Sequence, residues 1–368
     1  AVRLLQSDDG FYGGNMKGTM LAAVVYGQND LRLERVEIPQ VMPGSILIKV
    51  EACAICGTDM RIYKKGDYRA QYPVITGHEI AGTVVEMAEG VSGIKVGDRV
   101  CVAPGHGCGH CKMCLARQPN VCLTPYPSLG YKLNGGFAQY MAVPEHIFRL
   151  GFVNPIPETL TFEQASMSEI IACCLNAHRN APVCKGDTVL IFGAGPAGII
   201  HAHLARMEGA SKIIMTQRSK MRLDMVSERF PGLVDHLIAS DETDMEDTVM
   251  ADTGGLGADA VFVCAPSASA QEQGLRLVAN RGRVNFFGGL PKDDCQVKLN
   301  ANELHYKEFF VSGASSSLPE TNREALALLR TGKIDPDKLI TEILPLSEID
   351  DGYQLMESRK CIKVVIKP

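Results

Sequence analysis

The chain has 368 residues, of which 46% are hydrophobic and 21% charged, and its formal net charge is −5 at pH 7. This length favours two domains, and the composition is ordinary for a globular protein. The small negative charge gives no reason to expect nucleic acid or an anionic membrane as a partner, and no apolar run approaches the roughly 20 residues that a membrane-spanning helix needs.

Two features of the chain bear on where the protein works. The first fifteen residues, AVRLLQSDDGFYGGN, lack the apolar core of a signal peptide, and the following MKGTM looks like a natural start. We therefore expect residues 1–15 to be a tag remnant or a disordered extension. The thirteen cysteines do not indicate a secreted disulfide framework, which needs a short chain and a partner for each thiol. We expect a reduced, cytoplasmic protein that uses some cysteines for metal.

The first part of the chain predicts a compact β-rich domain. Short apolar runs are separated by turns that contain glycine and proline, such as Pro43-Gly44. Short strands at regular spacing are the sequence signature of such a domain. The runs cover residues 20–27, 31–38, 45–53 and 82–104.

The pattern changes near residue 160. Residues 161–180 have apolar side chains at helical spacing, with Thr161 as the N-cap and Gln164 three residues later. Residues 187–216 then read strand, glycine turn, helix, strand. Strands that alternate with helices predict a parallel, doubly wound sheet. Further strands are expected at 259–265 and 283–289, further helices at about 268–279 and 322–332, and a closing strand at 360–368.

A glycine-rich turn predicts a dinucleotide site. Gly193 permits a tight turn, Gly195 lets the backbone approach a pyrophosphate, and Gly198 lets the next helix pack closely on the strand. The helix N-terminus then offers free N–H groups to the phosphates. A structural turn in an unrelated α/β protein is the alternative. The motif follows the apolar strand TVLIF and reads Gly193-Ala194-Gly195-Pro196-Ala197-Gly198.

The end of the next strand bears on the choice of cofactor. An NAD enzyme usually has Asp or Glu there, about 20 residues after the glycines, to bind the ribose hydroxyls. This chain has Gln217, followed by Arg218, Ser219, Lys220 and, two positions on, Arg222. No carboxylate repels a 2′-phosphate, and arginine pairs well with one. We therefore favour NADP over NAD, although Gln217 can also bind a ribose hydroxyl.

Four cysteines predict a structural zinc site. Close thiolate pairs on a turn-rich loop supply the four soft ligands of tetrahedral zinc and leave no open position. A buried thiol cluster or redox pairs are the alternatives. The four are Cys108, Cys111, Cys114 and Cys122.

A second, more dispersed group predicts a catalytic metal site. Cys56 follows one expected strand, and His78 with Glu79 precedes another. Each alone is more often a core or surface residue. Together they offer one thiolate, one imidazole and one carboxylate, an incomplete set that leaves a position for water or substrate.

At this point the sequence resembles the zinc-containing medium-chain dehydrogenases, which include alcohol, sorbitol and threonine dehydrogenases. GHEIAGTVVEMAEGV at 77–91 follows their zinc signature, and the four-cysteine run and GAGPAG come in the same order. The resemblance runs from about residue 20 to the C-terminal end. It implies a GroES-like catalytic domain at 16–169 and 311–368, with a zinc lobe at about 105–123, and a Rossmann domain at 170–310.

The resemblance also implies the roles of individual residues. Cys56 and His78 match catalytic zinc ligands, and Glu79 is a ligand or lies immediately behind one. Alcohol dehydrogenases have a cysteine where this chain has Glu169, whereas polyol dehydrogenases have a glutamate, bound directly or through water. Glu169 therefore indicates the sorbitol dehydrogenase branch. Cys173, on the same helical face, is the reserve ligand or a small core residue.

In the family, zinc polarises the substrate hydroxyl and hydride passes to the nicotinamide. Thr58 matches the hydroxyl that takes the proton away. Many relatives continue this relay through a histidine where this chain has Arg61. Arg61 stays protonated, so the sequence does not define the route by which the proton leaves. Arg61 can instead contact cofactor phosphate. The segment 283–290, with Phe287 and Gly288, resembles the strand beside the nicotinamide carboxamide, and equally a central strand that ends in glycine.

The expected function is a two-zinc, NAD(P)-dependent oxidation of a secondary alcohol on a polyol or sugar-like substrate. A sugar-phosphate, threonine or simple alcohol dehydrogenase of the same family is the alternative. A non-catalytic relative would have lost zinc ligands or the glycine turn, and reductases of this fold that act on quinones or enones work without zinc. Relatives imply a homodimer or homotetramer joined through the nucleotide domain.

Overall fold

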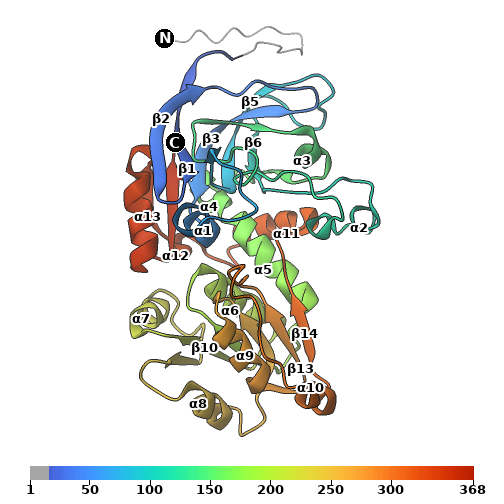
Figure 1. Ribbon diagram of the computed structural model, residues 1–368, viewed down its shortest axis with the longest axis vertical. Coiled ribbons are helices and arrows are strands. Elements are labelled where there is room, and N and C mark those ends of the chain that lie inside the picture. Colours follow the sequence, from blue (N-terminus) through green and yellow to red (C-terminus); the bar gives the residue numbers. More distant parts are fainter. Residues whose placement is uncertain (1–15) are drawn as a thin grey trace.

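The computed structural model describes residues 16–368, so the expected tag remnant or extension at 1–15 lies outside the described residues. Figure 1 shows two lobes stacked along the long axis of the molecule. One lobe contains both the first and the last strands, and the other is built from the middle of the chain. The predicted fold class, a β-rich lobe plus a doubly wound parallel sheet, is confirmed.

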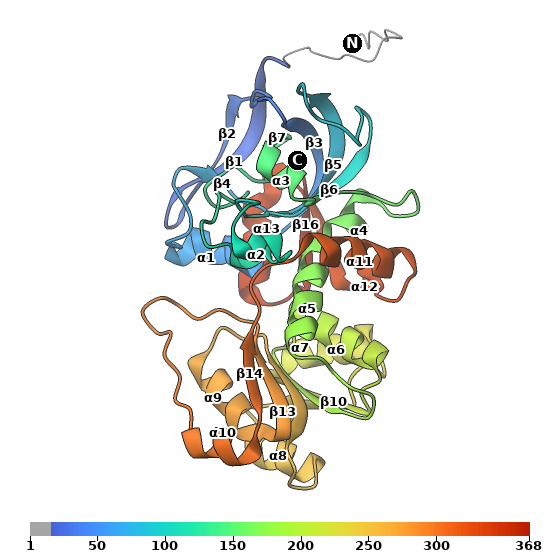
Figure 2. The same cartoon turned by 90° about the vertical axis from the view of Figure 1, so that its right-hand side faces the viewer.

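The middle lobe is a six-stranded parallel sheet with the order β11-β10-β9-β12-β13-β14. Its strands are β9 Thr188–Phe192, β10 Lys212–Gln217, β11 His236–Ala239, β12 Ala258–Val263, β13 Val278–Phe286 and β14 Phe310–Gly313. Its helices are α6 Pro196–Glu208, α7 Lys220–Arg229, α8 Met245–Asp252, α9 Ala268–Leu277 and α10 Ala301–Lys307. In Figure 2, α6 and α9 cover opposite faces of this sheet.

The burial of strand β9 is typical of a central strand in a parallel sheet. After its first residue every side chain of TVLIF is buried, as a strand covered by helices on both faces requires. The helix that follows packs so closely that a Cβ at Gly198 would lie 1.9 Å from the carbonyl oxygen of Gly193. Only glycine fits at this crossing of strand and helix.

The other lobe combines a three-stranded sheet, β2-β1-β4, with a seven-stranded sheet in which β7 pairs beside the path β15-β16-β3-β5-β6-β8. The strands are β1 Thr19–Gly27, β2 Asp30–Glu37, β3 Ile46–Ala54, β4 Val74–Ile75, β5 Glu79–Met87, β6 Arg99–Val102, β7 Tyr140–Val143, β8 Val153–Pro155, β15 Ile340–Pro345 and β16 Lys363–Lys367. The helices are α1 Gly57–Lys65, α2 Lys112–Leu115, α3 Glu145–Arg149, α4 Phe162–Ser166, α11 Pro319–Arg330, α12 Pro336–Leu339 and α13 Ile349–Ser358, with 3₁₀ turns at Pro119–Val121 and Leu346–Glu348. The C-terminal strand β16 lies inside this sheet, between β15 and β3.

The helical pattern at 161–180 forms two helices instead of one. Thr161 caps α4 through the predicted reciprocal contacts with Gln164. Met167 then has φ −69° and ψ −10°, a 3₁₀-like turn that interrupts the regular hydrogen bonds. Helix α5, Ser168–Asn180, continues toward the middle lobe (Figure 1).

Two further elements begin earlier than the sequence predicts. Strand β13 starts at Val278, directly after α9, because Val278 pairs with Ala258 before the register shifts. Helix α11 starts at Pro319, whose fixed φ and missing N–H suit the first helical position. Within residues 16–368, no helix has both the length and the apolar character needed to cross a membrane.

Candidate functional site: two groups of metal-binding side chains beside a nucleotide turn

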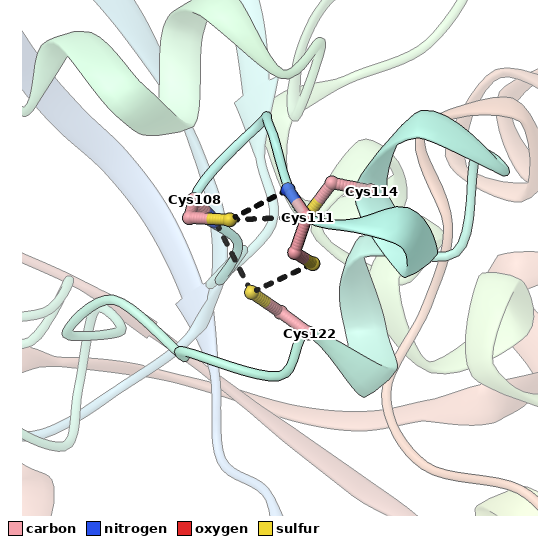
Figure 3. A group of neighbouring side chains, drawn as sticks. All are labelled: Cys108, Cys111, Cys114 and Cys122. Carbon is pink, nitrogen blue, oxygen red and sulfur yellow. Dashed lines mark hydrogen bonds between the residues drawn. The ribbon is translucent and has the colours of Figure 1, made fainter.

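The four cysteines of the predicted structural site converge on one point, as Figure 3 shows. The sulfur of Cys108 lies 3.9 Å from that of Cys114, and the sulfurs of Cys111 and Cys122 are 3.7 Å apart. Sulfurs about 2.3 Å from a central zinc define a tetrahedron with edges of about 3.8 Å. The spacing therefore fits a zinc ion without rearrangement.

The backbone favours the ionised form of two of these thiols, Cys108 and Cys111, whereas burial raises the pKa of Cys114 to about 12. The N–H of Cys111 points to the sulfur of Cys108 at 3.2 Å, and the N–H of Cys108 points to the sulfur of Cys122 at 3.3 Å. Backbone N–H donors lower the pKa of Cys108 and bring that of Cys111 to about 6. The loop is tight: a Cβ at Gly107 would lie 2.9 Å from the Pro119 side chain.

The second group forms where the chain crosses the end of the seven-stranded sheet. Cys56 caps α1 directly after β3, His78 precedes β5, and Glu79 is the first residue of β5. One ligand atom from each lies within 4.8 Å of the others. His78 and Glu79 are buried, so this thiol, imidazole and carboxylate share a site largely shielded from water.

Asp59 fixes the distance between the two halves of this group. Its side chain is fully buried. Oδ2 accepts the N–H of Cys56 at 2.9 Å, and Oδ1 accepts the N–H of Gly77 at 3.0 Å. Oδ1 also lies 3.2 Å from Nδ1 of His78. Although burial disfavours the charged imidazole, this carboxylate raises the pKa of His78 well above its ordinary value.

Glu79 has one satisfied and one unsatisfied oxygen. Its Oε1 accepts a hydrogen bond of 2.6 Å from Nζ of Lys363, on the C-terminal strand. Its Oε2 is buried without a partner among the described residues. An ionised oxygen left unpaired in a buried place is costly. A cation held with Cys56 and His78 would satisfy it, so the donor set fits a metal ion.

Glu169 lies near this group but outside it. The cluster of mutually close ligand atoms in residues 16–368 contains Cys56, His78 and Glu79, not Glu169. Glu169 accepts a hydrogen bond from the thiol of Cys173 at 3.3 Å. Burial raises its pKa to about 7, and the charges of His78 and Glu79 also act on it. Glu169 therefore lies near enough to feel the charges of this group without belonging to it.

Thr58 and Arg61 follow Cys56 on α1. Thr58 is half-buried in the first turn of the helix, two residues from Cys56. Arg61 donates from Nε to Asp67 at 2.9 Å. Arg61 therefore pairs with a carboxylate of its own lobe. The sequence alone instead allows Arg61 to contact a cofactor phosphate.

The glycine turn and the residues predicted around it lie together at the carboxyl ends of the parallel strands. Gly193 has φ 112°, which favours glycine. The N–H of Ala194 donates to Oε1 of Gln217 at 3.2 Å, so the end of β10 contacts the turn. The Arg222 guanidinium reaches within 3.0 Å of where a Cβ of Gly195 would be. The Arg218 side chain is 79% exposed, and its Nε lies 3.9 Å from Oδ1 of Asp241. Pro196, Ala197 and Gly198 open α6.

Phe287 and Gly288 lie beside the same turn. The N–H of Phe287 and that of Gly288 both donate to the carbonyl of Val263, at 3.1 and 2.9 Å. A Cβ at Gly288 would meet the carbonyl oxygen of Cys264 at 2.7 Å, and Cys264 also neighbours Gly193. Phe287 and Gly288, which are predicted to lie beside the nicotinamide, are therefore at the same edge of the parallel sheet as the glycine turn. Ligands of open parallel sheets usually bind at this edge.

Sequence reasoning assigned no role to three residues around the metal-binding group: Asp59, Tyr131 and Lys363. Asp59 stands three residues after the helix cap, where an acidic side chain often binds the cap backbone. Lys363 is a charge inside a run of buried apolar residues, which is itself a signal of a buried partner. Tyr131, whose ring centre lies 5.6 Å from that of His78, comes from a loop that gave no signal.

Comparison with known proteins places the chain among zinc-binding dehydrogenases. Family models described as the alcohol dehydrogenase GroES-like domain and as zinc-binding dehydrogenase match residues 42–152 and 196–331. The chain is 32% identical to a sorbitol dehydrogenase of Halalkalibacterium halodurans, covering 90% of this chain and 94% of the relative. It is 31% identical to an L-threonine 3-dehydrogenase of Bacillus velezensis, covering 97% and 100%. A crystal structure of a protein assigned as a zinc-binding dehydrogenase from Sinorhizobium meliloti 1021, bound to NADP, superposes with a TM-score of 0.87 at 30% identity, covering 95% and 100%.

Proposed function

Because this chain belongs to the zinc-dependent medium-chain dehydrogenase family, we propose that Cys56, His78 and Glu79 hold its catalytic metal. The protein is an oxidoreductase that transfers hydride between the secondary alcohol of a polyol or sugar-like substrate and NAD(P). The observation that carries the site assignment is the convergence of thiol, imidazole and carboxylate within 4.8 Å. Three ligands leave an open position for a substrate oxygen.

The residues around this site divide the work. Zinc held there would supply a Lewis acid for the substrate hydroxyl, and the nicotinamide would accept the hydride. Asp59 holds the backbones of Cys56 and Gly77, and thereby sets the geometry of the ligands. Thr58, two residues from Cys56, accepts the proton of the substrate hydroxyl in a hydrogen bond and passes it toward solvent. An unchanged turnover number in Thr58→Val would disprove this role of Thr58.

The two glutamates have different positions in this proposal. Glu79 contributes its free oxygen as a ligand while Lys363 neutralises the other. Glu169 acts through a water molecule, because it lies beside the group but not within it. A glutamate at this position, together with the sorbitol dehydrogenase relative, supports the polyol branch. The threonine dehydrogenase relative makes an amino alcohol the second candidate substrate.

Cys108, Cys111, Cys114 and Cys122 hold a second, structural zinc in this proposal. The sulfur separations of 3.7 and 3.9 Å support tetrahedral coordination. Four thiolates leave no position for substrate, so the ion would brace the loop that joins β6 to β7. Two zinc ions per chain are the expected metal content.

We infer that the protein prefers NADP. The uncharged Gln217 accepts a hydrogen bond from Ala194 in the glycine turn, at the strand end where NAD enzymes usually have a carboxylate. Arg222 lies next to the turn and Arg218 is exposed nearby, so both can pair with a 2′-phosphate. The NADP-bound relative of similar structure supports this preference.

We also propose that the chain forms a homodimer or homotetramer and works in the cytoplasm. Strand β14 lies at the edge of the parallel sheet, and Phe310 and Val311 on it are 61% and 42% exposed. Such an edge can pair with the same edge of a second copy. The domains are proposed to divide near 169/170 and 310/311, with the second boundary moved to the end of β14 because this strand pairs with β13 in the parallel sheet. All thirteen cysteines are free thiols, which supports a reducing compartment.

The test is nicotinamide reduction by the purified protein over a panel of sugar alcohols, inositols, threonine and simple alcohols. Each substrate is supplied with NAD and with NADP, before and after zinc chelation and after zinc is restored. We expect activity on a polyol that chelation abolishes and zinc restores. Activity that survives full removal of metal, in protein with no residual zinc, would refute the metal assignment.

A further inference from the structure

A charged cluster joins α1, which carries Arg61, to the loop between α1 and β4 that leads to His78. Asp67 is its centre, with a side chain only 4% exposed. One oxygen accepts from Nε of Arg61 at 2.9 Å and from Nη2 of Arg69 at 2.8 Å, and the other accepts from Nε of Arg69 at 2.9 Å. The backbone N–H of Arg69 adds a fourth hydrogen bond, at 3.0 Å. We call these residues the Arg61–Asp67–Arg69 cluster.

This cluster has a surplus of positive charge. Burial alone would raise the pKa of Asp67, but the hydrogen bonds from Arg69 hold it at about 2, so the carboxylate is ionised. It balances one of the two guanidinium groups. Within residues 16–368, Asp67 is the one carboxylate within 4.0 Å of the Arg61 or Arg69 nitrogens. One positive charge therefore lacks a partner.

The surplus charge lies close to the metal-binding group. The guanidinium carbon of Arg69 stands 5.2 Å from the ring centre of Tyr131. That ring centre is in turn 5.6 Å from the imidazole centre of His78. Arg69 is therefore separated from His78 by one aromatic side chain. The N–H of Gln71 donates to the carbonyl of Tyr131 at 3.0 Å, which ties the two loops together.

The same loop faces the other lobe. Nζ of Lys292, in the connection between β13 and α10, lies 5.8 Å from the ring centre of Tyr68. In Figure 2 this connection rises from the middle lobe toward α1. Arg69 follows Tyr68 in sequence and is 42% exposed. The loop that carries Tyr68 and Arg69 thus lies close to a segment of the lobe that carries the glycine turn.

We propose that the alcohol substrate carries an anionic oxygen group, a carboxylate or a phosphate, that Arg69 binds beside Tyr131. This rests on the proposed function, because it places the hydroxyl of the same molecule at Cys56, His78 and Glu79. Nη1 of Arg69 has no hydrogen-bond partner among the described residues. Asp67 holds the other guanidinium nitrogens in place, so the free edge is pre-oriented for an anion.

A similar set of residues elsewhere in the chain shows what is specific to this one. Arg32 makes two 2.8 Å hydrogen bonds to Asp30 and lies 4.4 Å from the ring centre of Tyr26. There, Tyr26 donates to Glu34, and among residues 16–368 Arg32 is the one arginine paired with Asp30, so the two carboxylates outnumber the paired guanidinium. An Asp-x-Arg pair beside a tyrosine therefore also occurs on the surface of this chain, and such a pair alone does not indicate an anion site. The extra arginine and the position of Arg69 against Tyr131, whose ring lies beside His78, distinguish the cluster.

The first test compares matched six-carbon substrates on the zinc-loaded full chain: sorbitol, sorbitol 6-phosphate and gluconate. We expect kcat/KM for at least one anionic substrate to exceed that for sorbitol, and the phosphate and carboxylate arms decide between the two anions. Arg69→Gln should reduce the ratio of anionic to neutral kcat/KM by about 10- to 100-fold, the range for one charged hydrogen bond. Arg32→Gln is the control and should leave the ratio unchanged. A preference for sorbitol, or a ratio that Arg69→Gln does not move, would overturn the proposal.

The second test does not need turnover, so it separates this inference from the proposed reaction. Binding of inorganic phosphate and of acetate is measured by calorimetry on the protein saturated with NADP, which occupies the other arginine-rich site. We expect one of the anions to bind the wild-type protein, with weaker binding to Arg69→Gln and partial retention in Arg69→Lys. Equal binding by wild type and Arg69→Gln, in variants with native melting curves, would contradict the role of Arg69.

Discussion

Lys363 and Glu79 form a buried ion pair that joins residues 284 positions apart, with Nζ 2.6 Å from Oε1. Neither side chain is more than 1% exposed. Because Oε2 of Glu79 is buried without a partner among the described residues, the lysine compensates one oxygen and leaves the other for a cation. The pair thus connects the last strand of the sheet to the proposed catalytic metal.

Replacement of Lys363 should lower the free energy of unfolding more in the metal-free protein than in the zinc-loaded protein. In Lys363→Met, the buried Glu79 carboxylate loses its counter-charge, a change that costs about 3–5 kcal/mol in comparable pairs. We expect this loss in urea denaturation after chelation, and a smaller loss in the zinc-loaded protein, where the cation neutralises Glu79. Lys367→Met is the control, because its partner Glu163 forms an exposed pair of under about 1 kcal/mol. Equal stability of Lys363→Met and wild type would contradict the account.

Loss of one cysteine should remove one of two zinc ions. Cys114→Ser replaces a thiolate of the tetrahedral group by a weaker ligand, so we expect metal analysis to fall from two zinc ions per chain to one. The melting temperature should fall with it, because the loop loses its brace. Cys184→Ser changes an exposed thiol outside the group and should retain both ions. Two ions in Cys114→Ser would disprove the structural site.

A carboxylate at the end of β10 should reverse the cofactor preference. Gln217→Asp places a negative charge beside the glycine turn, where it repels a 2′-phosphate and accepts from the ribose hydroxyls. We expect the ratio of kcat/KM for NADP to that for NAD to fall by at least about 10-fold, equivalent to about 1.4 kcal/mol. Steady-state kinetics with both cofactors measure it. A wild-type enzyme that already prefers NAD would refute the NADP assignment.

Acid should destabilise the fold through His203. Burial lowers its pKa in the folded protein to about 4, below the value of about 6.5 expected in the unfolded chain. The neutral imidazole therefore contributes stability that is fully present above about pH 6.5 and is lost as the pH falls toward 4. The contribution is on the order of 3 kcal/mol. The free energy of unfolding of His203→Leu should fall less than that of wild type between pH 7 and pH 4, whereas exposed His305→Asn should follow wild type.

The parts of the site that the sequence predicts are those encoded by local spacing. The glycine turn and the four cysteines each lie within one short segment, so the geometry follows from the chain itself. Gln217 was expected at the cofactor ribose because it ends the strand that follows the glycine turn. Its hydrogen bond with Ala194 brings it to the turn, while its role toward a cofactor stays a prediction.

What the sequence could not predict depends on contacts between distant segments. Lys363 approaches Glu79 only because β16 pairs with β3 and β3 with β5. Tyr131 reaches His78 from a loop after the cysteine lobe. The break at Met167 also escaped prediction, since the apolar spacing of 161–180 is the same for one helix or two. Periodicity defines a face, but not the partner that covers it.

The place of β16 in the sheet has a consequence for how the protein is made. Strands β9 to β14, which carry the nucleotide turn, leave the ribosome before residues 363–367, and β16 has to insert between β15 and β3 afterwards. Domains generally fold as units during synthesis. The nucleotide lobe can therefore mature on the nascent chain while Glu79 still lacks its lysine, so the sheet that holds Glu79 is completed after the nucleotide lobe.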